Sequence, residues 1–470
     1  MNTLAALGAR GIDRCVRRER AGTVPNGAEN LRLLDLSLHV TAWLLLVVSS
    51  VQSLGLAGPV AFLAINSILV WRRPQHGLMV LLTILYTPAL AFGLSRVFAV
   101  SVCVTAALWT VRWPLSAVRS AADAIQSPTT VAAIAFVLLA GVGLVVAPDL
   151  GLGFRYAQGY LESLIFFILA AALLRTANFD SISSWWVVVA AGATLIRLLH
   201  LHLGPSTPLY EAAVLVNQSD ATIAQRLSVF VDSSFAQRLL WPGEEPNYTA
   251  AGLLFPFSLA LSKVASPGPR RLWWLIAVLL LSAGILGTFS RSGAICAGLI
   301  LVCYLALLKN RAWMPTLILL SAVAFGLSQV PELVGRLGAI GDSLTREGAT
   351  GRFDLWALAV DLWSAAPLFG NGTAAYYATF RDAAHNSYLQ VAAELGLVGL
   401  IAYCLVPILA ARNALANWRN RSQKSEIPRL IGLIALSVMI ATLTFQDVKL
   451  FWLACAACSL PQSIRRAKPT

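Results

Sequence analysis

The chain has 470 residues, of which 58% are hydrophobic and only 12% are charged, and its mean hydropathy is +0.72. A soluble domain is normally about one quarter charged, so this composition excludes an ordinary soluble protein. The formal net charge is +13. In a membrane protein such an excess marks the basic loops that set the topology, so it indicates no nucleic-acid partner.

The first 33 residues form a basic arm that precedes the apolar part of the chain. Six arginines lie between residues 10 and 32, without the apolar stretch that is typical of a signal peptide. We expect this arm to remain in the cytoplasm, where it contacts anionic lipid headgroups.

Apolar runs recur through the rest of the chain, and a helix needs about 20 apolar residues to cross the hydrocarbon core. We therefore predict an all-α polytopic membrane protein with about 12 to 14 transmembrane helices. The predicted spans cover residues 34–52, 55–71, 77–94, 97–113, 129–147, 157–174, 183–201, 248–265, 272–290, 292–309, 313–330, 388–411, 429–446 and 449–463.

Basic residues fall mostly in the short loops on one side of the predicted membrane, which is therefore the cytoplasmic side. Both termini are expected on that side, and two long loops fall on the other, periplasmic side. Loops this long are uncommon unless they serve a function. The predicted organisation is a cytoplasmic arm (1–33), N-terminal transmembrane helices (34–201), a periplasmic loop (202–247), transmembrane helices that include the turn at Arg291 (248–330), a large periplasmic loop (331–387), C-terminal transmembrane helices (388–463) and a cytoplasmic tail (464–470).

The large periplasmic loop contains a predicted helix from Arg352 to Ala366. Apolar residues recur there at helical spacing, with Asp354 and Asp361 on the opposite face. Tryptophan is favoured at the membrane interface, so the helix either lies in that interface or packs on the transmembrane bundle. The predicted apolar face consists of Phe353, Trp356, Val360 and Trp363.

Two arginines lie at predicted helix starts. Arg291 falls in the short turn between two apolar runs, where Ser290 or Ser292 can cap the next helix, and Arg352 follows a glycine. A basic residue at a helix N-terminus adds to the positive end of the helix dipole, so it is unfavourable unless an anion is bound. The alternatives are an arginine that contacts lipid phosphate at 291 and an ordinary surface arginine at 352.

His385 is the histidine of the large loop, and it directly precedes the next predicted span. The pattern Ser387-x-x-Gln390 predicts a capping box at the start of that span. A helix N-terminus disfavours the imidazolium, so we expect a neutral imidazole that can accept a proton as a general base. A purely structural histidine is the alternative.

The remaining candidates for substrate binding are polar residues near the outer ends of spans, and an intramembrane carboxylate is functional by default. Asn247, which we predict to cap the span at 248–265, is one of them. The outer loops contain no D-x-D triplet, and the chain contains no Walker or dinucleotide fingerprint, so we expect neither a metal nor a cofactor. The full set is Asn247, Arg197, Asn386, Tyr388 and Glu394.

Four motifs occur in order in the C-terminal half. They read PNYTA at 246–250, TFSRSG at 288–293, GRFDLWALAVDLWSAAPLFGNG at 351–372 and HNSYLQVAAELGLVGL at 385–400. Together they resemble the O-antigen ligase and polymerase superfamily. The resemblance implies a metal-independent inverting glycosyltransferase with a GT-C-like architecture in the bacterial inner membrane, whose site faces the periplasm.

The resemblance also implies substrates and residue roles. The donor would be a glycan on undecaprenyl pyrophosphate, Arg291 and Arg352 would hold the pyrophosphate, and His385 would be the catalytic base. An O-antigen ligase would transfer the glycan to lipid A-core, whereas a polymerase would extend a second lipid-linked glycan. A flippase or transporter of polyprenyl-linked glycans is the alternative from another class. Membrane lipids surround the protein in each case, and a monomer is compatible with the sequence.

Overall fold

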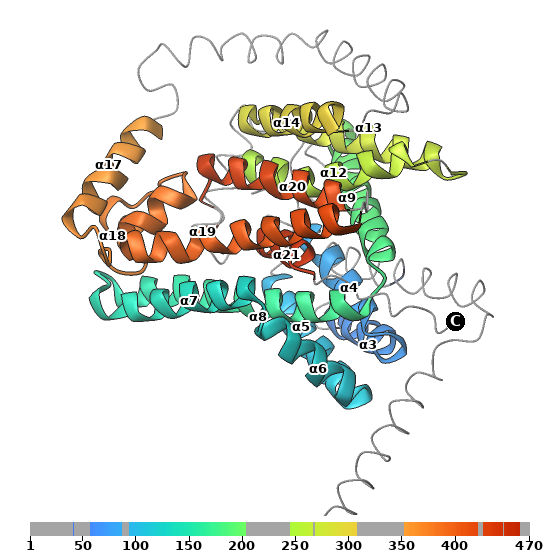
Figure 1. Cartoon of the computed structure of the whole chain (residues 1–470), viewed down its shortest axis with the longest axis horizontal. Helices are drawn as coiled ribbons and strands as arrows, with labels where there is room; N and C mark the ends of the chain where they lie inside the picture. The colour runs from blue at the N-terminus through green and yellow to red at the C-terminus, as the bar shows by residue number, and fades with distance from the viewer. Residues whose placement is uncertain are drawn as a thin grey trace, which may run out of the picture.

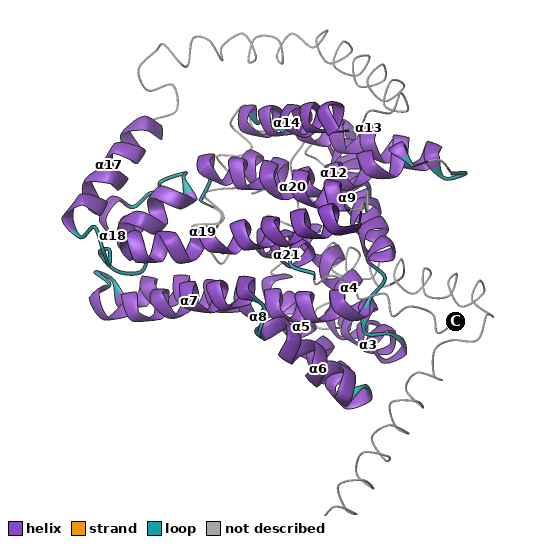
Figure 2. Ribbon diagram, viewed as in Figure 1, coloured by secondary structure: helices purple, strands orange, loops and turns teal. Residues whose placement is uncertain are grey.

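The computed structural model describes residues 57–86, 94–203, 245–266, 268–307, 352–421, 426–444 and 446–460, together with residue 41. Every regular element in these ranges is a helix (Figures 1 and 2). In chain order the elements are α3 (Ala57–Arg72), α4 (Gln75–Tyr86), α5 (Leu94–Arg112), α6 (Pro114–Ile125), α7 (Pro128–Val142), η1 (Gly143–Val146), α8 (Leu150–Thr176), α9 (Phe179–Leu203), α12 (Pro246–Ala265), α13 (Arg271–Gly287), α14 (Arg291–Leu307), α17 (Arg352–Ala365), α18 (Ala375–Phe380), α19 (Ser387–Arg421), α20 (Glu426–Met439), η3 (Ile440–Thr442) and α21 (Lys449–Cys458).

Five of these helical segments are long and apolar enough to cross a membrane, and six shorter apolar helices have 10 to 17 residues. The prediction of an all-α polytopic membrane protein is thus confirmed. The count of 12 to 14 spans stays a prediction, because the predicted span at 313–330 and all of the one at 34–52 except residue 41 lie outside the described residues. The five long segments are Pro128–Val146, Leu150–Thr176, Phe179–Leu199, Pro246–Ala265 and Ser387–Arg419.

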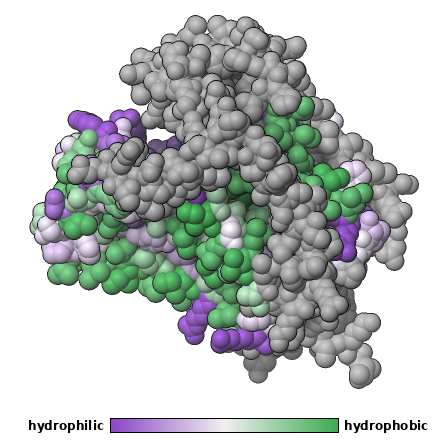
Figure 3. Space-filling model, turned by 90° about the horizontal axis from the view of Figure 1, so that it is seen from above, coloured by the Kyte–Doolittle hydropathy of each residue, from purple (hydrophilic) through white to green (hydrophobic). Residues whose placement is uncertain are grey.

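The helices α7, α19, α20 and α14 lie one above the other in Figure 1, with α12 behind them. The α12 span is 78% buried inside the protein, which makes it the centre of the bundle. Broad areas of the described surface are apolar (Figure 3), and side chains such as Val145 and Trp273 are 86% and 70% exposed. An apolar surface of this extent fits contact with lipid.

The sequence predicts no helix at the position of α6, because residues 114–128 fall between two predicted spans. Pro114 occupies its first turn, where the missing N–H costs no hydrogen bond. Its 12 residues include Arg119 and Asp123, so it is too short and too polar to cross a membrane.

The long segment α19 is not one straight helix. At Gly396 the backbone adopts φ +67°, and the Tyr388 and Tyr403 rings lie with their centroids 5.9 Å apart. Along a straight helix these two residues would be about 22 Å apart. The part from Ser387 to Leu395, here called the half-helix, therefore doubles back beside the following transmembrane part. The prediction of one continuous span at 388–411 is wrong in this respect.

Glycine is required at this reversal. A side chain at position 396 would collide with the Leu368 backbone, and one at Gly370 would collide with the Glu394 backbone. Hydrogen bonds also join residues 367–372 to this turn. The Gly372 N–H donates to the Glu394 carbonyl at 2.9 Å, and the Leu397 N–H donates to the Pro367 carbonyl at 2.9 Å. The end of the large loop is thus folded onto the bundle.

The predicted helix at 352–366 is confirmed as α17. Ala359 is fully buried and belongs to a small cluster with Tyr376 and Ala393, so α17 packs on the bundle. Phe353 and Val360 nevertheless remain exposed, at 64% and 45%. One face of α17 therefore packs on protein, while part of the predicted apolar face stays free to enter the membrane interface.

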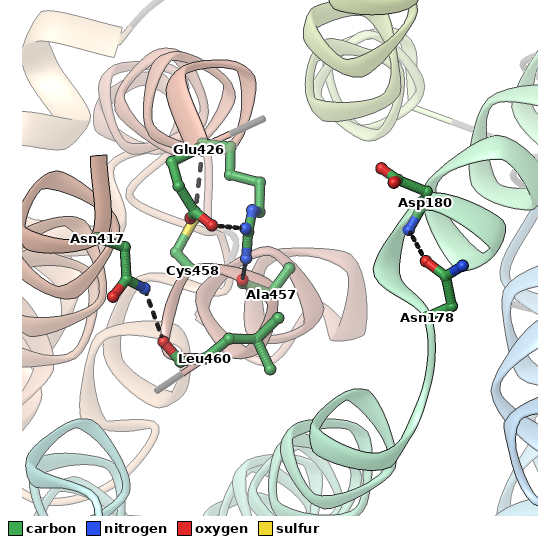
Figure 4. A network of polar contacts seen from close by, with 8 residues as sticks. Asn178, Asp180, Asn417, Glu426, Ala457, Cys458 and Leu460 are labelled. Atoms are coloured by element: carbon green, nitrogen blue, oxygen red, sulfur yellow. Dashed lines mark hydrogen bonds and ion pairs between the residues drawn. The ribbon is translucent and has the colours of Figure 1, made fainter. Parts of the chain in front are cut away.

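At the end of the bundle opposite the Gly396 turn, buried polar contacts hold the helices together (Figure 4). Arg429 is only 4% exposed; it pairs with Glu426, donates to the Ala457 carbonyl at 2.9 Å and stacks over the Phe179 ring at 4.3 Å. Arg429 thus ties α20 to α21 and α9. Its role is structural, although the sequence suggested only another topology-setting charge in a cytoplasmic loop.

Candidate functional site

The first turn of α12 is capped by a carboxylate. Glu245 is the N-cap residue, and its Oε2 accepts a hydrogen bond from the Tyr248 N–H at 2.8 Å. Its Oε1 accepts a hydrogen bond from the Asn247 carboxamide at 2.5 Å. A negative charge at this position offsets the positive end of the helix dipole. The prediction that Asn247 caps this helix is wrong, because Asn247 lies inside the first turn.

A short chain of hydrogen bonds joins this turn to the start of α14. Ser290 accepts a hydrogen bond from the Gly293 N–H at 3.1 Å and so caps α14, as predicted. The Ser290 hydroxyl also donates to the Asn247 Oδ1 at 2.6 Å. Asn247 therefore bridges Glu245 and Ser290, and Arg291, the first residue of α14, is held beside the start of α12.

Arg352 is the first residue of α17 and is partly buried. Burial lowers the pKa of Arg352, the nearby Glu245 carboxylate opposes this effect, and the nearby Arg291 charge adds to it. An arginine remains charged at neutral pH despite such a shift. Two charged groups from the starts of α12 and α14 thus act on the arginine at the start of α17.

His385 belongs to the same group of charges. Burial lowers the pKa of His385, and the Arg352 charge lowers it further, while Glu245 and Asp382 act in the opposite direction. The imidazole is therefore neutral at pH 7, and its Nδ1 is buried without a hydrogen-bond partner among the described residues. The backbone of His385 is in the left-handed region, at φ +48°, and such strained positions cluster at functional sites.

The backbone of His385 is held from two directions. Its N–H donates to the Thr444 hydroxyl at 3.1 Å, and that hydroxyl donates to the Gln390 Oε1 at 3.0 Å. The Thr444 carbonyl in turn accepts a hydrogen bond from the Tyr248 hydroxyl at 2.5 Å. Thr444 thus connects the histidine to the half-helix and to the first turn of α12.

The half-helix is capped one residue earlier than predicted. The Asn386 Oδ1 accepts hydrogen bonds from the N–H groups of Tyr388 at 3.0 Å and Leu389 at 3.1 Å. Ser387 instead donates to the Leu443 carbonyl at 2.6 Å, so the predicted capping box of Ser387 and Gln390 is wrong. Asn386 is a structural cap in this arrangement, with 9% of its surface exposed.

Tyr388 and Glu394 point away from the charged group. The Tyr388 hydroxyl donates to the Ser437 carbonyl at 2.9 Å, and its ring lines an apolar cavity of about 420 Å³ between α19 and α20. Glu394 is 1% exposed and accepts a hydrogen bond from the Gln390 carboxamide at 3.0 Å. Its carboxylate also accepts backbone hydrogen bonds at the start of α18. Glu394 therefore holds the loop together around the half-helix.

Arg197 is buried in α9, with 4% of its surface exposed, and its charge reaches the Tyr86 hydroxyl. The Tyr86 hydroxyl donates to the Gly252 carbonyl at 2.5 Å, so Arg197 lies deeper along α12 than Asn247 does. The charges of Glu245 and Arg291 act on Arg352. The charges of Arg352, Glu245 and Asp382 act on His385, and Arg197 is not one of these groups.

Four helical segments thus begin around one site: α12, α14, α17 and the half-helix. Helix N-termini carry partial positive charge, and two of these segments begin with an arginine. Such an arrangement favours a bound anion, most of all a phosphate, which guanidinium groups bind through paired hydrogen bonds. A neutral imidazole beside the anion can accept a proton.

Sequence reasoning missed two members of this site. The sequence did not predict Glu245 as an N-cap, although its position directly before Pro246 was the available signal. Thr444 gave no local signal, because its role depends on contacts with His385 and Gln390, which are far from it in the sequence.

Comparison with known families gives a match for one segment of the chain. Residues 276–404 match the O-antigen ligase family. This segment contains Arg291, Arg352 and His385. A search of the curated proteins gave no match. Over these residues the match bears out the resemblance to the O-antigen ligase and polymerase superfamily that the four sequence motifs indicate.

Proposed function

We propose that the protein transfers a glycan from a polyprenyl pyrophosphate donor to an acceptor hydroxyl, at the periplasmic face of the inner membrane and without a metal. The observation that carries this proposal is a set of hydrogen bonds through Asn247, Tyr248 and Thr444. They hold the start of α14 and the backbone of His385 against the start of α12, and the Arg352 charge acts on the same histidine. The same arrangement supplies both a diphosphate clamp and a proton acceptor.

In the proposed reaction the acceptor hydroxyl oxygen forms a bond to the anomeric carbon of the glycan. The bond from that carbon to the pyrophosphate oxygen breaks, and its electron pair stays on the pyrophosphate. Arg291 and Arg352 stabilise the charge that develops there, in a site where the helix N-termini are already oriented. The configuration at the anomeric carbon is inverted because the acceptor enters opposite the leaving group.

His385 takes the proton from the acceptor hydroxyl and later releases it to solvent. Because Nδ1 is buried, Nε2 is the nitrogen that we assign to this step. Asn386 and Thr444 fix the backbone on either side of the imidazole, which limits the geometries that it can adopt. Tyr388 faces an apolar cavity, which suits a contact with lipid chains better than one with sugar.

We assign undecaprenyl pyrophosphate as the lipid carrier and lipid A-core as the acceptor, which makes the protein an O-antigen ligase. The match to the O-antigen ligase family supports glycan transfer of the ligase or polymerase type in general. The polymerase alternative uses the same site and differs only in the acceptor, a second lipid-linked glycan. A flippase would need the clamp but would not need a proton acceptor beside it.

The test uses purified protein in lipid nanodiscs with a labelled undecaprenyl-pyrophosphate-linked glycan. Label should move to lipid A-core and not to a second lipid-linked glycan; the reverse result would identify a polymerase, and no transfer to either would reject the proposal. Arg291→Ala, Arg352→Ala and His385→Ala should each lower kcat/KM by at least about 100-fold. Arg155→Ala, which removes an exposed arginine on α8, is the matched control and should retain activity.

A further inference from the structure

Glu245 brings a fixed negative charge into a site that otherwise favours anions. Both of its carboxylate oxygens accept hydrogen bonds in the first turn of α12, from the Tyr248 N–H and from the Asn247 carboxamide. Asn247 is itself held by Ser290, the cap of α14. The carboxylate therefore cannot easily swing away when an anion enters between the helix starts.

Glu245 caps the turn that contains Tyr248, and Tyr248 is joined through Thr444 to the backbone of His385. The charge of Glu245 also acts on Arg352 and on His385. Asp382 is the other carboxylate that acts on His385, and Arg291 is the other cation that acts on Arg352. A carboxylate in this position weakens the binding of every anion to the arginines. Its presence needs an explanation, because tighter donor binding would follow from its removal.

The donor and the lipid product differ in charge. In the donor, both phosphates are esterified, so each carries one negative charge. After transfer, the terminal phosphate carries no ester, and its second proton dissociates with a pKa of about 6, so the product gains nearly one further charge at pH 7. Two arginines that bind the donor well would bind this product still more tightly, and the product would then block the site.

We propose that Glu245 is a specificity-determining residue that discriminates between the lipid-linked donor and the more highly charged polyprenyl pyrophosphate product. The inference rests on the proposed function. Repulsion from Glu245 grows with the charge on the phosphates, so it weakens the product more than the donor. Glu245 thereby speeds product release and keeps the arginine pair available for the next donor.

The experiment measures two constants for full-length protein in nanodiscs: KM for the undecaprenyl-pyrophosphate-linked glycan, and the inhibition constant for free undecaprenyl pyrophosphate. Glu245→Gln keeps the side-chain length and removes the charge. We expect its inhibition constant to fall by about tenfold, KM to fall by a smaller factor, and kcat to become limited by product release. A burst of product in the first turnover would show that limit directly.

Two variants separate charge from capping. Glu245→Asp keeps both the charge and the ability to cap a helix, so it should retain the wild-type ratio of the two constants. Asp382→Asn removes the other carboxylate near His385 and should leave that ratio unchanged while it shifts the pH profile. If Glu245→Gln leaves the ratio as in the wild type, or weakens product binding, the inference is wrong. A wild-type protein that neither transfers glycan nor is inhibited by undecaprenyl pyrophosphate would instead reject the proposed function.

Discussion

The Ser290 hydroxyl donates a hydrogen bond of 2.6 Å to the Asn247 carboxamide oxygen, and so joins the cap of α14 to the first turn of α12. Neither residue has to touch the substrate for this contact to matter. It sets the position of Arg291 relative to Glu245, and under the proposed function the balance of these two charges determines how strongly the site attracts a diphosphate.

We expect Asn247→Leu to lower donor affinity without abolishing turnover. The substitution leaves the Ser290 hydroxyl and one Glu245 oxygen without their partners, which costs about 1–3 kcal/mol of stability. Asn247→Gln keeps an amide that can accept from Ser290 and donate to Glu245, adds no charge, and is the matched control. The measurement is KM for the lipid-linked donor together with Tm in detergent; equal donor KM in wild type and Asn247→Leu would contradict the assigned positioning role.

The acid limb of the pH–rate profile should report His385. Its pKa lies below the ordinary value of 6.5, so the base stays neutral and active until the pH falls through that lowered value. Arg352 lowers this pKa and Glu245 raises it. Arg352→Ala should therefore move the acid limb to higher pH, and Glu245→Gln should move it to lower pH. Shifts of kcat/KM in the same direction for both variants would exclude His385 as the titrating group.

Gly396→Ala should destabilise the protein by more than about 2 kcal/mol, because φ is positive there and the new methyl group would meet the Leu368 backbone. Gly192→Ala is the control, since a methyl group at that position has open space around it. Thermal unfolding in detergent compares the two variants. The prediction fails if the Tm of Gly396→Ala matches that of Gly192→Ala.

Removing one partner of the Glu426–Arg429 pair should cost about 3–5 kcal/mol, because the other charge is left buried. Glu426→Ala is the informative variant, and Arg419→Ala, which removes an exposed arginine near the end of α19, is the control. The loss should appear in Tm and in the amount of folded protein. The transfer reaction per folded molecule should not change, because this pair lies at the other end of the bundle from His385.

Much of the site could be predicted from local sequence. Arg291 and Arg352 were placed at helix starts because a serine cap and a glycine mark those starts within a few residues. His385 was placed next to a helix start by the polar residues that follow it. These signals act over one turn of helix, which is the range over which capping chemistry operates.

The doubling back at Gly396 could not be predicted in the same way. It depends on the fit of Gly396 against Leu368 and of Gly370 against Glu394, and each pair is separated by more than twenty positions in the sequence. The apolar composition of 388–411 is equally compatible with a straight span. Likewise, the pairing of Glu245 with the arginines exists only once α12, α14 and α17 have packed.

The reversal at Gly396 sets the depth at which His385 operates. The half-helix has nine residues, and His385 lies just before its first residue. His385 is therefore about 13 Å inward from the turn at Gly396. Water is the nucleophile that competes with any sugar hydroxyl for an activated glycan, and it is most abundant at the rim of the bundle. Under the proposed function, we expect the recessed histidine to favour an acceptor that reaches down to it, so the glycine turn would protect the lipid-linked glycan from hydrolysis.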